Sequence, residues 1–207
     1  MRIALIGATG MIGSRIAAEA RSRGHEVTGI TSSGSDGTVT ADARDAASVA
    51  AAVRGHDAVV DAIAPPRDGS DATPPMLEYA RGILEGMRSA GVRRLLIVGG
   101  ASSLEVAPGV RLFDSPRFPE VARNEAAAGI AQFALIREEA GDLDWTYVSP
   151  AAIIAPGERT GTFRVGGDQL LTDAEGNSSI SAEDYAIALV DELEKGQAIR
   201  RRISVAY

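Results

Sequence analysis

Short apolar runs alternate with longer amphipathic stretches along the first half of the chain. The apolar runs are rich in Val, Ile and Leu, which is typical of strands buried in a parallel sheet. They occupy Arg2–Ile6, Glu26–Ile30, Val39–Ala41, Ala58–Ile63 and Arg94–Val98. Because parallel strands need crossover connections, the alternation predicts an α/β fold of the Rossmann type, a doubly wound and mostly parallel sheet with helices on both faces.

Residues that begin and end helices divide the stretches between these strands. Three helices are predicted there: Met11–Arg23 before Gly24, a helix capped by Asp45 that runs through Val53, and a helix capped by Thr73, with Pro74 at its first position, that ends at Gly91. Each has the length of a crossover between parallel strands.

The second half of the chain alternates less regularly. Gly99–Pro119 is an irregular stretch longer than most loops, and loops of that length are often functional. The pattern then predicts a helix over about Glu120–Ala140, a strand at Trp145–Ser149, a helix that opens at Ser181 with a capping-box partner at Asp184, and a final strand at Ile203–Ala206. With 207 residues, 45% of them hydrophobic, we expect one domain with a small substrate-side region at about residues 150–207.

The charge balance argues against nucleic acid as a partner. The formal net charge is -7 and the pI is near 4.9, whereas affinity for phosphate backbones comes mainly from clustered Lys and Arg. The basic cluster Arg200–Arg202 is too short to change this, and we expect it to be the solvated start of the last strand.

The chain contains no cysteine and two histidines, His25 and His56. Disulfides and thiolate metal sites are therefore excluded, and no metal site is expected. Both histidines precede strands, so we expect them at the surface, at the sheet edge opposite to the one that binds ligands. The apolar run Ile3–Ile6 is far shorter than a signal-peptide core, and no stretch approaches the roughly 18 apolar residues of a membrane span, so we expect a cytoplasmic protein without membrane contact.

A glycine-rich loop stands between the first predicted strand and the first predicted helix. Its sequence from Gly7 to Gly13 is Gly-Ala-Thr-Gly-Met-Ile-Gly. The first glycine permits the tight turn, Gly10 lets a pyrophosphate approach the backbone, and Gly13 lets helix and strand pack closely. The unpaired N–H groups of the following helix can then hold the diphosphate without a lysine, which predicts a dinucleotide site.

The residues after the second strand favour NADP(H) over NAD(H). Proteins that bind NAD usually have an acidic residue about 20 residues past the glycine loop, where it accepts hydrogen bonds from the ribose. Here these positions are Thr31, Ser32 and Ser33, which would not repel a 2′-phosphate. Arg15 on the first helix is a candidate for a cationic contact to that phosphate. Asp42 is either an acceptor for the adenine amino group or a turn residue, and the sequence leaves both interpretations open.

The available side chains limit the chemistry that can follow binding. Short-chain reductases of carbonyls use a tyrosine with a lysine four residues later, but no tyrosine here has that partner, and Lys195 is the one lysine in the sequence. Ser102 and Ser103 follow the fifth strand, near the expected nicotinamide. Either a loop-capping role or a hydrogen bond to substrate suits them, and Ser102 is the candidate catalytic residue. Reduction of a flavin or quinone suits this inventory, because such an acceptor takes hydride at an electron-poor centre and can receive its proton from water.

Five segments of the chain carry a resemblance to a known family. They are Gly7–Gly13, Gly55–Val60, Val98–Leu104, Asp144–Ala151 and Gly166–Leu171. Together they resemble the atypical short-chain dehydrogenase/reductases, the group that includes the NADH-flavin reductases and proteins similar to biliverdin reductase B. The first segment is shared by many nucleotide-binding families, and the later segments are more specific.

The resemblance implies which residues contact the cofactor. Those around the diphosphate would be Gly7, Thr9, Gly10, Met11 and Ile12; those near the ribose phosphate Thr31 and Ser32; those near adenine Asp42 and Ala43; those under the cofactor Ala62, Ile63 and Ala64; and those beside the nicotinamide Pro150 and Ala151. It implies no particular acceptor, and the protein would be a monomer or a homodimer that acts on a small molecule.

Two other functions remain open on the sequence. A regulatory protein similar to the NmrA-like regulators would bind the nucleotide as a redox signal without turning it over. A sugar-nucleotide epimerase is disfavoured by the missing Tyr–Lys pair and by the short segment after Pro150.

Overall fold

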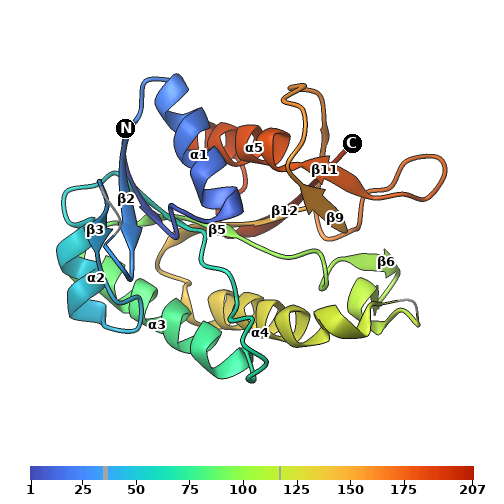
Figure 1. The fold of residues 1–207 in the computed structure, drawn as a ribbon, viewed down its shortest axis with the longest axis horizontal. Coiled ribbons are helices and arrows are strands. Elements are labelled where there is room, and N and C mark those ends of the chain that lie inside the picture. The colour runs from blue at the N-terminus through green and yellow to red at the C-terminus, as the bar shows by residue number, and fades with distance from the viewer. Residues whose placement is uncertain (35–36, 117) are drawn as a thin grey trace.

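The computed structural model describes residues 1–34, 37–116 and 118–207, and within them eight strands form one sheet (Figure 1). These strands are β1 (Arg2–Ile6), β2 (Glu26–Thr31), β3 (Val39–Thr40), β4 (Ala58–Asp61), β5 (Arg94–Val98), β8 (Asp144–Ser149), β10 (Arg164–Gly166) and β12 (Arg201–Ala206). Their order across the sheet is β10-β12-β8-β5-β4-β1-β2-β3, and β10 alone runs antiparallel to its neighbour in this described sheet. The predicted mostly parallel sheet is confirmed.

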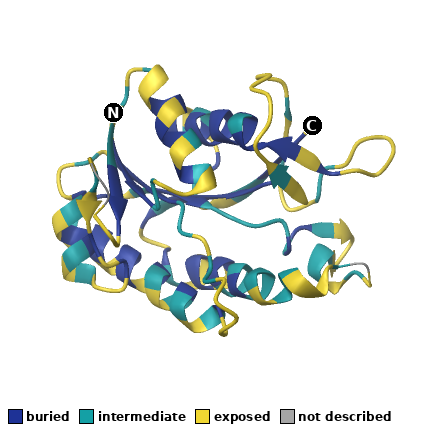
Figure 2. Ribbon diagram, in the orientation of Figure 1, coloured by how far each residue is buried: buried dark blue, intermediate teal, exposed yellow. Residues whose placement is uncertain are grey.

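Helices cover both faces of the sheet (Figure 1). On one face lie α1 (Met11–Ser22) and α5 (Ala182–Lys195), and on the other lie α2 (Ala46–Val53), α3 (Thr73–Ala90) and α4 (Arg123–Glu139). Because successive strand side chains point to opposite faces, Ile3 and Leu5 of β1 join the core under α1 and α5, while Ala4 and Ile6 join the core under the other helices. Figure 2 shows the buried strands between the two helical layers, and the doubly wound arrangement is confirmed.

Short elements occupy stretches that the sequence pattern left irregular. The segment after β5 contains a hairpin of β6 (Glu105–Ala107) and β7 (Val110–Arg111) and the 3-10 turn Leu112–Asp114. A second 3-10 turn, Glu120–Ala122, takes the place of the start of the helix predicted from about Glu120. After β8, a second small sheet pairs β9 (Ile153–Ala155) with β11 (Ser179–Ser181) in parallel. With two or three residues each, β6, β7, β9 and β11 are too short to show a hydrophobic period, and the sequence pattern did not predict them.

The capping predictions are right for two helices and wrong for α3. The carboxylate of Asp45 accepts the N–H of Ala47 at the start of α2, and Ser181 Oγ accepts the N–H of Asp184 at the start of α5. In α3, by contrast, Thr73 is the first helical residue, and its N–H donates to Asp71 Oδ1 at 2.9 Å. Asp71 thus accepts the N–H of the first helical residue, while the capping position, Ala72, has no side-chain cap.

The two histidines lie at the amino edge of the sheet as predicted, but they are partly buried there. His25 Nε2 lies 2.8 Å from Glu194 Oε1, and His56 Nε2 lies 2.9 Å from Thr28 Oγ1. Both rings thus link elements together instead of standing free at the surface. Among the described residues, no helix combines the length and the apolar composition needed to cross a bilayer.

The sheet changes its winding direction between β1 and β4, which pair at its centre. The chain continues from β1 into α1 on one face and from β4 towards α3 on the other face. In open α/β sheets, ligands bind beyond the carboxyl ends of the strands at such a point. β4 ends at Asp61, two residues before the predicted end, because Asp61 Oδ1 accepts the N–H of Ile63 at 3.0 Å and turns the chain.

Candidate nucleotide-binding site

The glycine loop, Gly7–Gly13, follows β1 at the place where the sheet changes its winding direction. Its glycines allow very close packing of the backbone. Gly7 has φ +80°, and a Cβ built on it would lie 2.6 Å from the carbonyl oxygen of Ala62. A Cβ on Gly13 would lie 2.2 Å from the carbonyl oxygen of Gly7, whereas a Cβ on Gly10 would meet nothing nearer than 3.4 Å. Gly7 and Gly13 are therefore required by the packing of the protein itself, and Gly10 leaves space on the open side of the loop.

The first turn of α1 offers donors for an anion. Gly10 caps the helix without a side chain, and there is no acidic residue in the first turn. Among the described residues, no acceptor meets the N–H groups of Met11, Ile12 or Gly13, while the N–H of Ser14 begins the helical pattern by donating to Gly10. Helix N-termini carry a partial positive charge and bind phosphate groups through such N–H groups. The loop therefore fits the diphosphate of a dinucleotide.

Three hydroxyl residues stand at the end of β2. Thr31 forms hydrogen bonds within the protein, whereas Ser32 and Ser33 are exposed. Thr31 is buried, and its Oγ1 accepts the N–H of Gly34 and lies 3.0 Å from Thr38 Oγ1. Ser32 is consequently better placed than Thr31 to bond a ligand, and the assignment of both to the ribose phosphate stays a prediction.

Arg15, the candidate cationic contact, is engaged with another helix. Its Nε donates to Glu183 Oε1 on α5 at 2.5 Å, and its Nη1 donates to the carbonyl of Met11. Glu183 Oε2 in turn accepts the N–H of Gly157. Arg15 therefore joins α1 to α5 and to the segment after β9, and nothing in this arrangement supports a role at the 2′-phosphate.

Asp42, predicted to be either a turn residue or an acceptor for adenine, makes a hydrogen bond within a turn. Its Oδ1 accepts the N–H of Arg44 at 2.9 Å, and the side chain is 59% exposed. Ala43 beside it is buried. The contact of Asp42 and Ala43 with adenine stays a prediction, since the exposed carboxylate can serve the turn and a ligand together.

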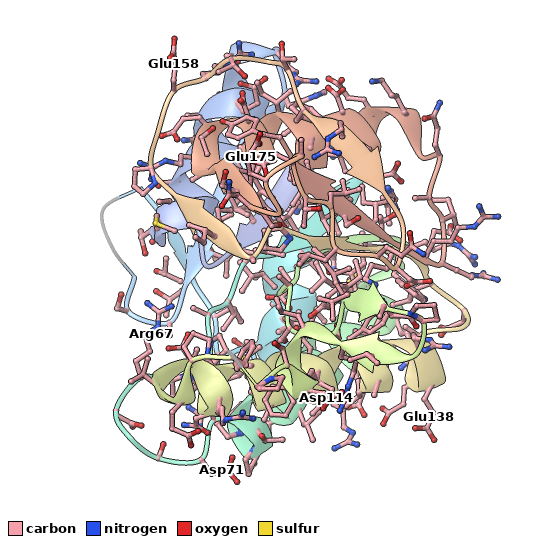
Figure 3. The ribbon with its side chains drawn as sticks, turned by 90° about the vertical axis from the view of Figure 1, so that its right-hand side faces the viewer. Arg67, Asp71, Asp114, Glu138, Glu158 and Glu175 are labelled. Atoms are coloured by element: carbon pink, nitrogen blue, oxygen red, sulfur yellow. The ribbon has the colours of Figure 1, made fainter. Side chains whose placement is uncertain are left out.

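The segment after β4 is in direct contact with the glycine loop. The N–H of Ala62 donates to the carbonyl of Ile6 at 2.9 Å, and the carbonyl of Ala62 packs against Gly7. Ile63 and Ala64 follow at the open edge of the sheet, and Arg67 then forms a bidentate ion pair with Glu125 of α4. Arg67, on this loop after β4, and Glu158, on the segment after β9, are labelled in Figure 3.

The residues predicted beside the nicotinamide follow β5 and β8. Pro150 and Ala151 are buried directly after β8. Ser102 is 8% exposed, and its hydroxyl donates to the carbonyl of Ala126 in α4 at 3.3 Å. This contact gives Ser102 the loop-fixing role, and its catalytic role stays a prediction.

Sequence reasoning missed three buried polar side chains near this edge. Asp61 is 3% exposed at the end of β4, and its Oδ2 accepts the side-chain amide of Gln132 at 3.1 Å. Burial is the main cause that raises the pKa of Asp61, to about 6. Arg202, expected to be solvated, is only 5% exposed, donates to Ser103 Oγ at 2.8 Å and lies 4.5 Å from the centre of the Phe133 ring. An aspartate that ends an apolar strand was the one signal that could have indicated this cluster.

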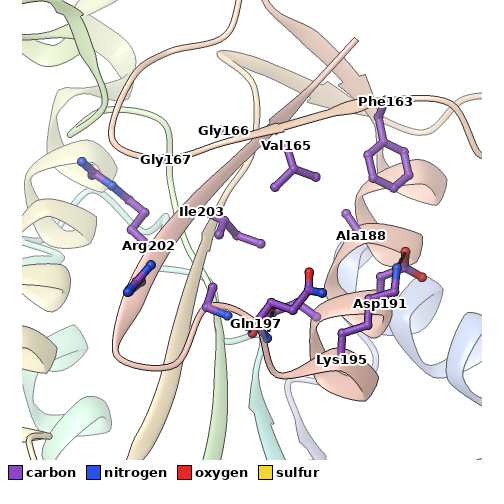
Figure 4. A pocket seen from close by; sticks show the side chains of 13 residues that line it. Phe163, Val165, Gly166, Gly167, Ala188, Asp191, Lys195, Gln197, Arg202 and Ile203 are labelled. Carbon is purple, nitrogen blue, oxygen red and sulfur yellow. Dashed lines mark hydrogen bonds and ion pairs between the residues drawn. The ribbon is translucent and has the colours of Figure 1, made fainter.

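A groove of about 390 Å³ lies elsewhere, between β10, β12 and α5 (Figure 4). Phe163, Val165 and Ile203 line its apolar part, and Lys195 at one end pairs with Asp191 at 2.7 Å. No residue predicted to bind the cofactor lines this groove. The glycine loop and the groove are thus separate features.

The fold and the glycine loop together define a dinucleotide-binding protein of the Rossmann type. Residues 7–196 match the pattern of a family described as NAD(P)H-binding. The chain is also 36% identical over 214 residues to the protein YwnB of Bacillus subtilis, with 99% of this chain and 98% of that protein covered. It therefore belongs to the NAD(P)H-binding family, whose cofactor is a nicotinamide nucleotide.

Solved structures agree with this assignment over the whole chain. One from Burkholderia pseudomallei, named a "putative exported protein", is 48% identical with a TM-score of 0.91 and full coverage of both chains. A "putative NADH-flavin reductase" from Streptococcus pneumoniae is 36% identical with a TM-score of 0.87, covering 100% of this chain and 99% of that one. A "putative epimerase" from Bacteroides thetaiotaomicron is 37% identical with a TM-score of 0.90, covering 100% and 96%. The resemblance to atypical short-chain dehydrogenase/reductases is confirmed.

Proposed function

We propose that this chain is an NADPH-dependent reductase that transfers hydride to a flavin or quinone-like acceptor. The observation that carries the proposal is the glycine-lined start of α1: its first turn has no acidic residue, and among the described residues no acceptor meets the N–H groups of Met11, Ile12 and Gly13. The similarity to a structure named an NADH-flavin reductase supports the choice of acceptor. The segment at about 150–207 would form the substrate side of the same domain, in keeping with ligand binding at the carboxyl ends of the strands.

Tyr147, Tyr185 and Lys195 support an acceptor that needs no proton from a tyrosine. Burial raises the pKa of Tyr147 and of Tyr185 above the usual value, so neither is poised to give or take a proton near neutral pH. Lys195 pairs with Asp191 in the last turn of α5 and activates no tyrosine. A flavin or quinone can take its proton from water, and the work left to the protein is to place acceptor and cofactor face to face.

Each part of the chain has a defined task in this proposal. A bound nicotinamide nucleotide would supply the hydride. The first turn of α1 binds the diphosphate, Ala62–Ala64 support the cofactor from below, and Pro150 and Ala151 keep water from the nicotinamide side by their burial. Ser102 holds the loop after β5 against Ala126, and this loop would carry the acceptor. The catalytic effect is therefore one of orientation and water exclusion.

The preference for NADP(H) rests on the exposed hydroxyls of Ser32 and Ser33 after β2. A carboxylate at position 32 would repel a 2′-phosphate and could accept hydrogen bonds from a free ribose. We expect Ser32→Asp to weaken NADPH binding by about tenfold or more while NADH binding stays equal or improves, as measured by titration of both nucleotides. Equal affinity of the wild-type protein for both nucleotides would contradict the preference.

The reductase activity is tested by steady-state oxidation of NADPH with FMN, FAD or a quinone as the acceptor. The rate should rise above the background rate without acceptor, and Ser102→Ala should lower it if the loop after β5 orients the acceptor. A flat trace with every acceptor, together with tight NADP binding and a stable protein partner, would instead support a nucleotide-sensing regulator similar to the NmrA-like proteins.

A further inference from the structure

Three polar contacts lie one turn apart along a single face of α4. The carbonyls of Ala126 and Gly129 accept the hydroxyls of Ser102 and Tyr147, and Gln132 donates its side-chain amide to Asp61. Residues three apart share one helix face. The three partners come from the loop after β5, from β8 and from the end of β4, so α4 is tied to both the acceptor side and the cofactor side of the site.

Asp61 is the unusual member of this set. It is 3% exposed, and it forms no ion pair with any residue that the structure describes. A buried carboxylate without a cation costs stability, and residues that lower stability in a cleft are often kept for function. The groups that bond its carboxylate, the side-chain amide of Gln132 and the N–H of Ile63, are both neutral.

The carboxylate holds the turn that meets the glycine loop. Asp61 Oδ1 accepts the N–H of Ile63 at 3.0 Å, which closes a turn around Ala62. The carbonyl of Ala62 lies so close to Gly7 that a Cβ there would be 2.6 Å away. Any shift of this turn would therefore move the backbone on which the first glycine rests.

We propose that Asp61 is a positioning residue of the nucleotide site, which fixes the turn at Ala62 against Gly7 and is itself held by Gln132 of α4. The inference rests on the proposed use of the glycine loop to bind NADPH. It adds that the carboxylate at the end of β4 sets cofactor affinity without touching the cofactor, and that α4 links this turn to the loop that carries Ser102.

Two substitutions at position 61 separate the hydrogen bond from the packing. Asp61→Ala leaves the Ile63 N–H without its acceptor, and we expect the dissociation constant for NADPH, measured by titration, to rise about tenfold. Asp61→Asn keeps an acceptor oxygen for Ile63, and Gln132 can turn its amide to match, so affinity should stay within about twofold of wild type. In Asp61→Ala the KM for the acceptor should change less than the KM for NADPH, a split that general destabilisation would not produce.

Asp57→Ala is the matched control, because Asp57 also accepts a backbone N–H, from Arg2, but precedes β4 at the opposite edge. It should bind NADPH as wild type does. If Asp61→Ala does not fold, Gln132→Met tests the same idea, since it removes the amide donor and keeps a similar volume; we expect about threefold weaker binding.

The outcomes distinguish this inference from the proposed function. Wild-type NADPH affinity in folded Asp61→Ala, or equal losses in Asp61→Ala and Asp61→Asn, would overturn the positioning role. If Asp61→Ala does not fold, wild-type NADPH affinity in Gln132→Met would overturn the positioning role instead. A wild-type protein that binds NADPH but reduces no acceptor would overturn the reductase proposal alone, because the binding titrations still test Asp61.

Discussion

Gly10 and Gly13 lie three residues apart in one loop, yet a side chain should have different effects at the two positions. A Cβ on Gly13 would lie 2.2 Å from the carbonyl oxygen of Gly7, so the backbone would have to move. A Cβ on Gly10 would have 3.4 Å of clearance, and the φ and ψ of Gly10, -67° and 167°, suit any residue. The fold therefore requires a glycine at position 13 but not at position 10, where we expect the ligand to require it.

We therefore expect Gly13→Ala to lower the free energy of unfolding by about 1–3 kcal/mol, as overpacking does. Gly10→Ala should stay within about 1 kcal/mol of wild type and weaken NADPH binding by about tenfold or more, because the methyl group occupies the path of the pyrophosphate. Urea denaturation and nucleotide titration of both variants measure this. Normal NADPH affinity in Gly10→Ala would contradict the diphosphate site.

The unpaired carboxylate of Asp61 makes stability depend on pH. Burial raises its pKa from 3.8 to about 6, so the folded state binds a proton more readily than the unfolded state. The free energy of unfolding therefore falls as the pH rises from about 4 to about 6, and above about pH 6 the ionised Asp61 lowers it by about 3 kcal/mol.

Asp61→Asn should remove this cost. We expect it to be more stable than wild type by up to about 3 kcal/mol at pH 8, with a smaller gain at pH 5. Urea denaturation at the two pH values measures the difference. A lower stability of Asp61→Asn at pH 8 would show that the charged form is favoured in the folded state.

At the scale of the element, α3 shows how tertiary structure selects among nearby capping residues. The sequence offers Asp71, Thr73 and Pro74 within four positions, and we predicted that Thr73 would cap the helix. The loop before α3 is held instead from α4, where Asn124 Oδ1 accepts the N–H of Ala72 and its amide donates to Ser70. This placement brings Asp71 to the N–H of Thr73.

We expect Asp71→Ala to lower the free energy of unfolding by about 1 kcal/mol, the usual effect of losing one hydrogen bond. Thr73→Val should have a smaller effect, because its hydroxyl makes no capping contact. Thermal denaturation of the two variants tests the assignment. A larger loss in Thr73→Val would restore the cap that the sequence alone suggested.

At the scale of the whole molecule, the proposed nucleotide site joins the glycine loop between β1 and α1 to the turn after β4, so binding there should stabilise the fold as a unit. A ligand that binds only the folded state adds about 2.7 kcal/mol at 100 times its dissociation constant. We expect the melting temperature to rise with NADPH concentration, and at equal concentration to rise more with NADPH than with NADH. The Gly10→Ala variant should show a smaller rise, and an equal rise in that variant would argue against the site.

The succession of strands and helices along the chain could be predicted because β1, β4 and β5 are largely apolar runs and several helices carry their own start or stop residues. The glycine loop could be predicted because tight turns and close packing at Gly7 and Gly13 tolerate almost no other residue. Such constraints leave a glycine that is visible in the sequence, even at Gly7, where the contact is with the distant Ala62.

Only the tertiary structure decided which polar groups are paired. Asp61 and Gln132 are 71 positions apart, and Arg202 and Ser103 are 99 apart, yet each pair shares a hydrogen bond. The same packing engages Arg15 with Glu183 and turns Arg202 inward from a segment that reads as solvated. Such contacts depend on how separate elements meet in space. Many polar residues along the chain are chemically able to form them, so no sequence pattern specifies which residues become partners.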